Sequence, residues 1–362
     1  GDYSNKDTFA KLADAITTAE KAYTNVSDTR LNYKAARDTL EKVRVALTKN
    51  VSTESSNPKT FRILDKKTVI KEMGAGINLG NTMDGGLYDS SETGWQAYKT
   101  TKDYIKALHD AGYNTVRIPV TWGSHINDDY TIDEAWINRV QEIVDYCVDQ
   151  DMYAIVNIHH DGAANHDDRG NNTPACWLDT YSQNIEKVYQ KYEGVWNTIA
   201  NRFKDYDEHV IFESMNEVTD AHGTATNEDD AVLNALNQLF INTVRATGSN
   251  NTKRWLAITG RFATTAAITT MPEDTLADSG DLGTTRLMFA VHIYKSNNNV
   301  RWSYDDLKQW QSSMSSSYKN VGNLDVNMPI YVGEYGVRTK AQNGSATGYN
   351  NAERALNYEM CA

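Results

Sequence analysis

Short apolar runs rich in β-branched residues recur along the chain from about residue 60 onwards, and a longer segment with helical periodicity follows each of them. This alternation is the pattern of repeated β-α units, whose strands pair in parallel. The runs that we interpret as strands span residues 74–81, 113–120, 153–160, 210–217, 255–260, 287–294 and 329–336. The pattern therefore predicts an α/β fold built on seven parallel strands.

Nearly all of these runs end in polar or ionisable side chains. The residues concerned are Arg117, His159, Asn216, Glu217, His292, Tyr294 and Glu334. A parallel barrel gathers the carboxyl ends of its strands at one mouth, where its active site lies, whereas a doubly wound sheet does not bring so many strand ends together. We therefore predict a (β/α)8 TIM barrel in which these side chains converge.

Two stretches at the N-terminus differ in pattern from the barrel. Residues 1–50 are polar with a sparse apolar stripe at three-to-four spacing, which predicts a helical hairpin or a small helical bundle. Residues 51–60 are small and polar, as is typical of a linker, so the barrel domain is expected over residues 61–362. No apolar run follows the helix predicted near residues 351–361. We therefore expect a barrel that lacks its eighth strand and is C-terminally incomplete, with a second chain or another segment completing it.

Composition excludes several classes of partner. The 362 residues are 40% hydrophobic and 23% charged, which is ordinary for a soluble globular chain, and no apolar run is long enough to span a bilayer. The formal net charge of −12 and the lack of a concentrated lysine and arginine surface argue against nucleic acid. We therefore expect neither a membrane nor a nucleic acid as partner, and a neutral substrate instead.

Two glutamates stand at the ends of strands that face each other across the predicted mouth. Glu217 closes the fourth run and Glu334 closes the seventh. Hydrolysis of a glycosidic bond with retention needs one carboxyl group that protonates the leaving oxygen and a second, about 5–5.5 Å away, that attacks the anomeric carbon. This pair can supply both groups. Glu213, deeper on the fourth strand, is expected to be structural and to pair with a buried cation.

Metal chemistry is not predicted. Histidines and aspartates at residues 159–161 and 166–168 offer metal-like ligands, but they lack the paired spacing on one helix face that marks a zinc site. We therefore expect neither a metal nor another cofactor.

Six motifs follow one another along the barrel region. They are Gly-Ile-Asn-Leu-Gly-Asn-Thr at residues 76–82, Thr-Val-Arg-Ile-Pro-Val at 115–120, Asn-Ile-His-His at 157–160, Met-Asn-Glu at 215–217, His-Ile-Tyr at 292–294 and Gly-Glu-Tyr-Gly at 333–336. In this order they resemble glycoside hydrolase family 5, and the resemblance covers residues from about 67 to 340. The Asn-Leu-Gly-Asn-Thr opening is similar to the branch that contains endoglucanases, lichenases and xyloglucanases.

The resemblance implies a role for each matching polar residue. Glu217 would be the acid/base and Glu334 the nucleophile of a two-step retaining reaction. Asn216 would bind the sugar 2-hydroxyl, an interaction that strengthens in the transition state. Arg117 and Tyr294 would hold the nucleophile ionised and oriented, because donors to a carboxylate favour its charged form.

The resemblance also implies the substrate contacts around this pair. His159, His160 and His292 would line the subsite where the bond breaks. Tryptophan rings stack on the apolar faces of sugar rings in such clefts. The candidates are Trp95, Trp122, Trp177 and Trp302. The tryptophan that the family carries on its eighth strand has no counterpart here, in keeping with the expected incomplete barrel.

The activity implied is that of a retaining endo-β-1,4-glucanase that hydrolyses cellulose-like or mixed-linkage β-glucan, so a β-glucan polysaccharide is the expected partner. A xyloglucanase or a β-mannanase is an alternative, because the catalytic residues are shared across substrates. An alternative of another class is a catalytically impaired carbohydrate-binding barrel. The resemblance implies a secreted or cell-surface location, although the first residues carry no signal peptide.

Overall fold

The computed structural model describes residues 60–85, 91–162, 176–180, 182, 184–218, 227–264, 272–275, 277, 285–295 and 328–337. The predicted hairpin of residues 1–50, residues 51–59 of the linker and the helix predicted near residues 351–361 lie outside the described residues, as does Trp302. The predicted domain limits and the missing eighth strand therefore stay predictions. In the described part, no helix combines the length and the apolar character needed to cross a membrane.

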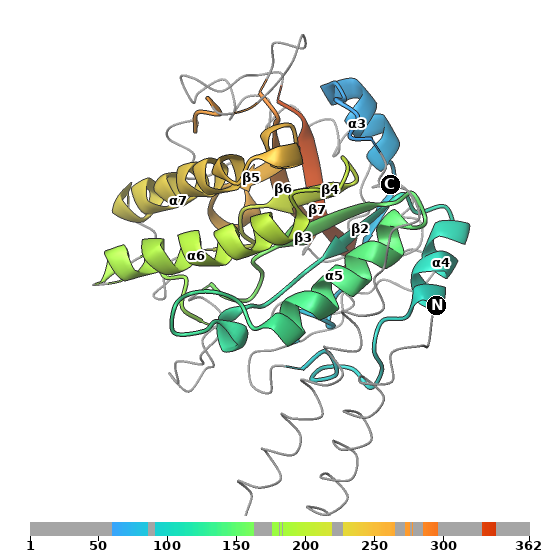
Figure 1. Ribbon diagram of the computed structural model, residues 1–362, viewed down its shortest axis with the longest axis horizontal. Helices are drawn as coiled ribbons and strands as arrows, with labels where there is room; N and C mark the ends of the chain where they lie inside the picture. Colours follow the sequence, from blue (N-terminus) through green and yellow to red (C-terminus); the bar gives the residue numbers. More distant parts are fainter. Residues whose placement is uncertain are drawn as a thin grey trace, which may run out of the picture. The chain divides into compact units, whose positions relative to one another are not determined.

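Seven strands form one parallel sheet in which each strand pairs with the next one along the chain (Figure 1). They are β1 (Gly76–Asn78), β2 (Thr115–Ile118), β3 (Tyr153–Asn157), β4 (Val210–Glu213), β5 (Leu256–Thr259), β6 (Leu287–Lys295) and β7 (Ile330–Val337). The sheet curls into a nearly closed barrel, and each predicted strand overlaps one observed strand. The predicted TIM barrel is confirmed.

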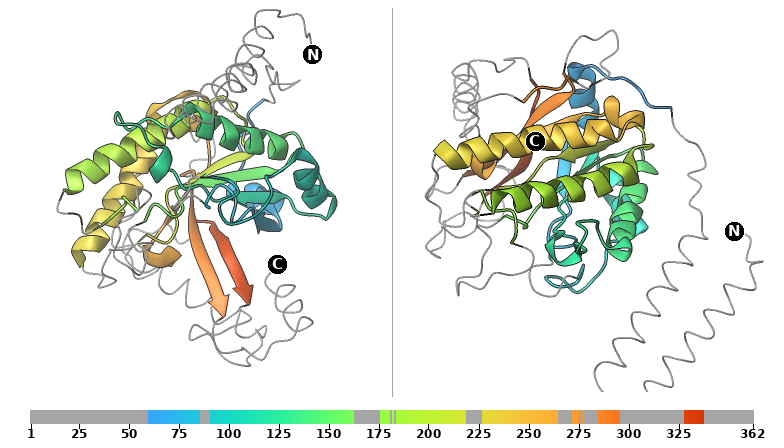
Figure 2. Two further views of the ribbon diagram at one scale, coloured as in Figure 1. Left: turned by 90° about the horizontal axis from the view of Figure 1, so that it is seen from below. Right: turned by 60° about the vertical axis from the view of Figure 1, so that its left-hand side comes forward.

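In the described residues an α-helix precedes each of the strands β1 to β5. These helices are α3 (Lys66–Met73), α4 (Lys102–Asp110), α5 (Glu134–Val148), α6 (Ile185–Phe203) and α7 (Asn227–Ala246). Two of them begin at capping side chains, because Asp65 accepts a hydrogen bond from the Thr68 N–H before α3 and Thr101 accepts one from the Tyr104 N–H before α4. Helices α6 and α7 lie side by side along the outside of the sheet (Figure 2).

Helix α6 fixes the backbone that follows β4. The fully buried Trp196 ring lies 5.8 Å from the ring of Phe212 in β4. The Trp196 indole and the Tyr192 hydroxyl both donate to the carbonyl of Ser214, at 3.2 and 2.8 Å. Because Ser214 comes directly after β4, these contacts hold the segment that leads to Glu217.

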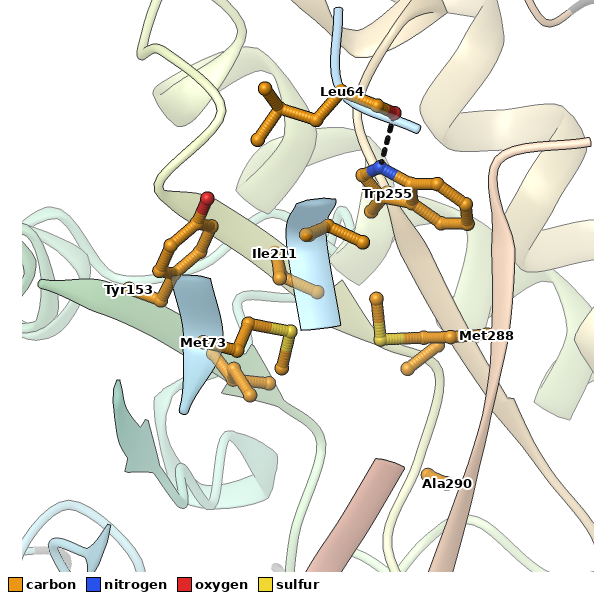
Figure 3. Packing of buried hydrophobic residues seen from close by; sticks show 10 residues of the cluster. Leu64, Met73, Tyr153, Ile211, Trp255, Met288 and Ala290 are labelled. Carbon is orange, nitrogen blue, oxygen red and sulfur yellow. Dashed lines mark hydrogen bonds between the residues drawn. The ribbon is translucent and has the colours of Figure 1, made fainter. Parts of the chain in front are cut away.

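A hydrophobic cluster fills the end of the barrel at which the strands begin (Figure 3). Its members are Leu64, Val69, Met73, Tyr153, Ile155, Ile211, Trp255, Ala257, Met288 and Ala290. Several of them stand at or next to the first residue of a strand, and Val69 and Met73 come from α3. The Trp255 indole donates to the carbonyl of Leu64 at 3.3 Å, as Figure 3 shows. Helix α3 therefore closes this end, and the polar strand ends face the opposite one.

Strands β1 and β7 are the edges of the sheet. No ladder joins them within the described residues, but the Asn78 side-chain amide donates to the carbonyl of Gly333 at 2.8 Å. A cavity of about 210 Å³ lies at this seam, lined by Ile70 of α3, Ile77 of β1 and Tyr331 of β7 among others. A side-chain contact therefore brings the two edges together where backbone pairing is absent.

Candidate active site

Arg117 of β2 is buried in the barrel and connects four side chains that lie on or just beyond three other strands, β1, β4 and β7. Its Nε and Nη2 atoms donate to the two carboxylate oxygens of Glu213, at 2.9 and 2.6 Å. Nη2 also donates to Asn216 Oδ1 at 2.9 Å, while Nη1 donates to Asn78 Oδ1 at 3.0 Å and to Glu334 Oε1 at 2.7 Å. The prediction that Glu213 pairs with a buried cation is confirmed.

Glu334 of β7 is held by two donors. Besides the bond from Arg117, its Oε2 atom accepts a hydrogen bond from the Tyr294 hydroxyl at 2.6 Å. Burial alone would raise the pKa of Glu334, but Arg117, His292 and the Tyr294 hydroxyl outweigh burial and hold the pKa below its ordinary value. Glu334 is therefore ionised at neutral pH, and the predicted contacts of Arg117 and Tyr294 with it are confirmed.

Glu217 lies beyond the end of β4 and close to Glu334. His292 connects the two, with Nδ1 2.7 Å from Glu217 Oε1 and Nε2 3.7 Å from Glu334 Oε1. One carboxylate oxygen of Glu217 lies within 4.8 Å of one of Glu334. This spacing fits a retaining pair, whose carboxyl groups stand about 5–5.5 Å apart, better than an inverting pair at about 6.5–9.5 Å. The Glu217 side chain is 40% exposed, so it can reach a ligand.

His159, just beyond β3, is buried against the carboxylate pair. Its Nδ1 atom lies 3.1 Å from the amide nitrogen of Asn157, and its Nε2 atom lies 4.0 Å from Glu334 Oε1. Burial lowers the pKa of His159 well below its ordinary value, and the neighbouring His160 and Arg117 lower it further. His159 is therefore a neutral imidazole, which can exchange hydrogen bonds with a hydroxyl group.

His160 has different partners. Its Nε2 atom lies 3.7 Å from Asp84 Oδ2, and its ring stands edge-on to Trp95 at 5.3 Å. Asp84 also accepts a hydrogen bond from the Thr82 N–H at 2.8 Å, and burial raises its pKa. Trp95 is 42% exposed, so part of its ring remains open to a sugar.

Trp122 does not fulfil the predicted stacking role, and that prediction is wrong. Its side chain is fully buried, and its indole nitrogen donates to the carbonyl of Asn157 at 2.9 Å. A ring with no exposed surface cannot meet a sugar face. Trp122 instead packs behind the strand end that carries His159.

Trp177 is partly buried and fixed at both its edge and its face. Its indole nitrogen donates to Asp161 Oδ1 at 2.6 Å, and the Lys191 ammonium lies 4.8 Å from the ring centroid. Asp161 also accepts the Trp122 backbone N–H at 3.0 Å. One face of Trp177 is thus covered by Lys191, and the predicted contact with substrate stays a prediction.

Four further residues belong to this site, although the sequence predicted no catalytic or sugar-binding role for them: Asn78, Asn157, Asp84 and Asp161. Asn157 donates to Glu213 Oε1 at 3.1 Å, so it supports the same buried carboxylate as Arg117. Both asparagines are the last residues of their strands, which is the signal that identified the other site residues. The two aspartates lie in loops, where a carboxylate is most often a surface charge.

Histidines and carboxylates gather in three places in the described part of the chain. The groups are Asp84 with His159 and His160, Asp207 with Glu208 and His209, and Glu217 with His292 and Glu334. Hydrogen bonds and ion pairs within each group account for the proximity of its members. We assign no metal to them, and the expected absence of a metal stays a prediction.

The barrel and its carboxylate pair together define a glycoside hydrolase, because two close carboxyl groups at the mouth of a barrel are what hydrolysis of a glycosidic bond requires. The family model for Cellulase (glycosyl hydrolase family 5) matches residues 52–360, and the chain belongs to this family.

Individual relatives agree with this membership. The chain is 34% identical to Endoglucanase A of Ruminococcus albus over 296 residues, which cover 78% of this chain and 77% of that protein. A family 5 xyloglucanase from Paenibacillus pabuli, solved in complex with ligand, is similar with a TM-score of 0.66 and 32% identity, covering 80% of this chain and 85% of that one. A broad-specificity endoglucanase from Ruminococcus champanellensis with bound cellotriose gives a TM-score of 0.63 and 31% identity, covering 79% and 83% of the two chains.

Proposed function

We propose that this chain is a retaining endo-β-1,4-glucanase acting on cellulose-like or mixed-linkage β-glucan. The observation that carries the proposal is the pairing of Glu334, held ionised by Arg117 and Tyr294, with Glu217 at retaining distance. The similarity to endoglucanases supports the choice of substrate. The net charge of −12 is compatible with an uncharged polysaccharide.

In the proposed reaction each glutamate carries out its own step. Glu334 attacks the anomeric carbon, the bond from that carbon to the leaving oxygen breaks, and the proton of Glu217 passes to the leaving oxygen. Glu217, now ionised, takes a proton from water as the water oxygen displaces Glu334 from the sugar. His292, between the two carboxylates, orients Glu217 for both transfers.

Two neighbours of the pair would bind the sugar in the subsite where the bond breaks. Asn216 receives a hydrogen bond from Arg117 on its carbonyl oxygen, which leaves its amide nitrogen to donate to the 2-hydroxyl. His159, being neutral, can accept from or donate to a further hydroxyl.

Xyloglucan is the second candidate substrate, since the Paenibacillus pabuli xyloglucanase is among the similar structures. Mannan is a third, because the carboxylate pair does not discriminate among β-linked sugars. A polymer of this size does not cross a cell membrane, so the proposal places the protein outside the cell or on its surface. Proteolytic accessibility of the protein on intact cells of its source tests that location.

The test of the activity is release of reducing sugar from mixed-linkage glucan, soluble cellulose, xyloglucan and mannan. Glu334→Gln should lower the rate by several powers of ten while a cooperative thermal unfolding transition shows that the protein stays folded, because a covalent nucleophile is removed without loss of volume. Glu193→Gln, which changes an exposed glutamate of α6, is the matched control and should keep the wild-type rate.

Wild-type-like turnover in Glu334→Gln would exclude Glu334 as nucleophile. Tight glucan binding by the wild type without any product would favour the non-catalytic carbohydrate-binding alternative.

A further inference from the structure

Asp84 is a buried carboxylate in the loop that follows β1. Its Oδ1 atom accepts a hydrogen bond from the Thr82 N–H at 2.8 Å. A short polar side chain that binds a nearby backbone N–H shapes many turns, and an uncharged asparagine can do so as well. Burial of a negative charge costs free energy unless a partner offsets it. The shape of the loop alone therefore does not account for a carboxylate at this position.

The second oxygen of this carboxylate faces the His160 side chain. Asp84 Oδ2 lies 3.7 Å from His160 Nε2. Burial raises the pKa of Asp84, and the electrostatic attraction to His160 opposes that rise. One oxygen of Asp84 thus holds its own loop, while the other draws one edge of the imidazole towards it.

Thr121, which follows β2, holds the backbones of both residues. Its hydroxyl donates to the carbonyl of Asp84 at 3.1 Å and accepts the N–H of His160 at 3.3 Å. The backbone N–H of Thr121 donates to the carbonyl of Met83 at 3.0 Å. The carboxylate and the imidazole are therefore kept opposite each other by contacts between the segments that follow β1, β2 and β3.

The imidazole of His160 also contacts two other rings. The Trp95 ring stands edge-on to it with 5.3 Å between the ring centroids, and the His159 ring does so at 4.4 Å. His159 Nε2 in turn lies 4.0 Å from Glu334 Oε1. These contacts lead from the nucleophile outward to Trp95, whose surface is 42% exposed.

An exposed aromatic ring binds a sugar face more tightly when its orientation is already set, because ordering a side chain on binding costs free energy. The His160 imidazole is the neighbour that can set the orientation of Trp95, and Asp84 holds that imidazole. We propose that Asp84 is a positioning residue that orients Trp95 for glucan binding through His160, an inference that rests on the proposed glucanase function.

Asp84→Asn separates this role from the shape of the loop. The amide oxygen can still accept the Thr82 N–H, which leaves the amide nitrogen, an uncharged donor, to face His160. The attraction is then lost, and the imidazole and the Trp95 ring are no longer held. KM for soluble mixed-linkage glucan should rise about two- to tenfold, the range of one stacking contact, while kcat stays within about twofold of the wild type.

A double-mutant cycle distinguishes positioning from a general structural role. Trp95→Ala removes the ring through which Asp84 acts, so adding Asp84→Asn to Trp95→Ala should raise KM no further. His160→Gln removes the imidazole and leaves Asp84 intact, and it should raise KM as Asp84→Asn does. Asp128→Asn, at an exposed position, is the matched control and should keep the wild-type KM.

Thermal unfolding shows which variants are folded, and His160→Gln takes the place of Asp84→Asn in the cycle if the latter is not. Additive effects with Trp95→Ala, an unchanged KM or a loss confined to kcat would overturn the proposal. A wild type that cleaves no glucan refutes the proposed function instead. Calorimetric titration with cellotetraose then decides the role of Asp84 alone, because equal affinities of wild type and Asp84→Asn would overturn it.

Discussion

Arg117 shows how one side chain can organise a site at the scale of single residues. A guanidinium offers five donors in a fixed plane, and here they bind Glu213, Asn216, Asn78 and Glu334. The ion pair between Arg117 and Glu213 is buried, and it fixes the guanidinium group. The hydrogen bond to Glu334 therefore comes from a donor whose position is already set. Preorganised donors of this kind need no rearrangement during the reaction.

Tyr294 contributes the other donor to Glu334, and its removal has a predictable effect on pH dependence. The Tyr294 hydroxyl favours the ionised form of Glu334, so Tyr294→Phe should raise the pKa of Glu334. The nucleophile must be ionised to react, and the acidic limb of kcat/KM against pH should therefore move to higher pH, with a lower plateau. Profiles of wild type and Tyr294→Phe on one soluble glucan measure this shift.

Tyr113→Phe, which removes a hydroxyl at the far end of the barrel, serves as the control for that profile. An acidic limb that stays in place or moves to lower pH in Tyr294→Phe would contradict the role of the Tyr294 hydroxyl.

The sequence predicted the residues whose position at a strand end already implies convergence. Arg117, Tyr294 and Glu334 come together as expected because parallel strands in a barrel bring their ends to one mouth. Trp122 was placed wrongly, because its position just after the second predicted strand does not say whether the ring points to the mouth or back into the protein.

At the scale of elements, the pairing of β6 with β7 leaves room for the His292 side chain. The register of the two strands shifts between Val291 and His292, and Gly333 of β7 faces the imidazole. A Cβ atom at Gly333 would lie 3.0 Å from His292 Nε2 and 3.2 Å from its Cδ2. The absence of a side chain at Gly333 therefore lets His292 stand beside Glu217.

Gly333→Ala should move the His292 ring by a few tenths of an ångström and weaken its 2.7 Å contact with Glu217. We expect kcat to fall about tenfold with little change in KM, because small misplacements of catalytic groups cost rate more than binding. Steady-state kinetics on a soluble glucan, with thermal unfolding as a check on the fold, measure this effect.

Gly80→Ala is the matched control, since a Cβ atom there meets nothing within 4 Å. An unchanged kcat in Gly333→Ala would mean that the imidazole tolerates the methyl group, while a large loss of stability would mean that β7 and not His292 is disturbed.

The strands were predictable as elements but their ends were less so. Their apolar cores match the sequence pattern, whereas β4 stops at Glu213 and β3 at Asn157, before the polar residues that were counted with them. Once a chain leaves the ladder, side-chain contacts decide its course, as those of Tyr192 and Trp196 with the Ser214 carbonyl do here. Completion of the barrel by another chain or segment stays a prediction, because residues beyond 337 are outside the described ones.

At the scale of the whole barrel, the partly buried Asp145 and the fully buried Asp161 differ from Glu334 in the direction of their pKa shifts. Burial raises the pKa of Asp145 in α5 to about 6 and that of Asp161 to about 7. Burial would also raise the pKa of Glu334, yet its donors keep that pKa below the ordinary value. Ionisation of Asp145 or Asp161 therefore lowers the stability of the fold, whereas ionisation of Glu334 raises it.

These directions predict how stability depends on pH. An aspartate in the unfolded chain loses its proton near pH 4, whereas the folded protein keeps the protons of Asp145 and Asp161 until about pH 6 and 7. The folded state binds more protons across that window, so these two groups make stability fall as pH rises from about 4 to about 7. Asp145→Asn and Asp161→Asn should each flatten the fall in Tm between pH 5 and 7.5, as thermal unfolding followed by circular dichroism would show.

Measuring both variants separates ionisation from local contacts. Asp145 accepts a hydrogen bond from Tyr206 at 2.6 Å, whereas Asp161 holds Trp177, so the two replacements share only the loss of a buried carboxyl group. Asp128→Asn, at an exposed position, controls for the change of one charge. Tm curves of both variants parallel to the wild type would refute the elevated pKa values, and flattening in Asp161→Asn alone would trace the effect to the loop that carries Trp177.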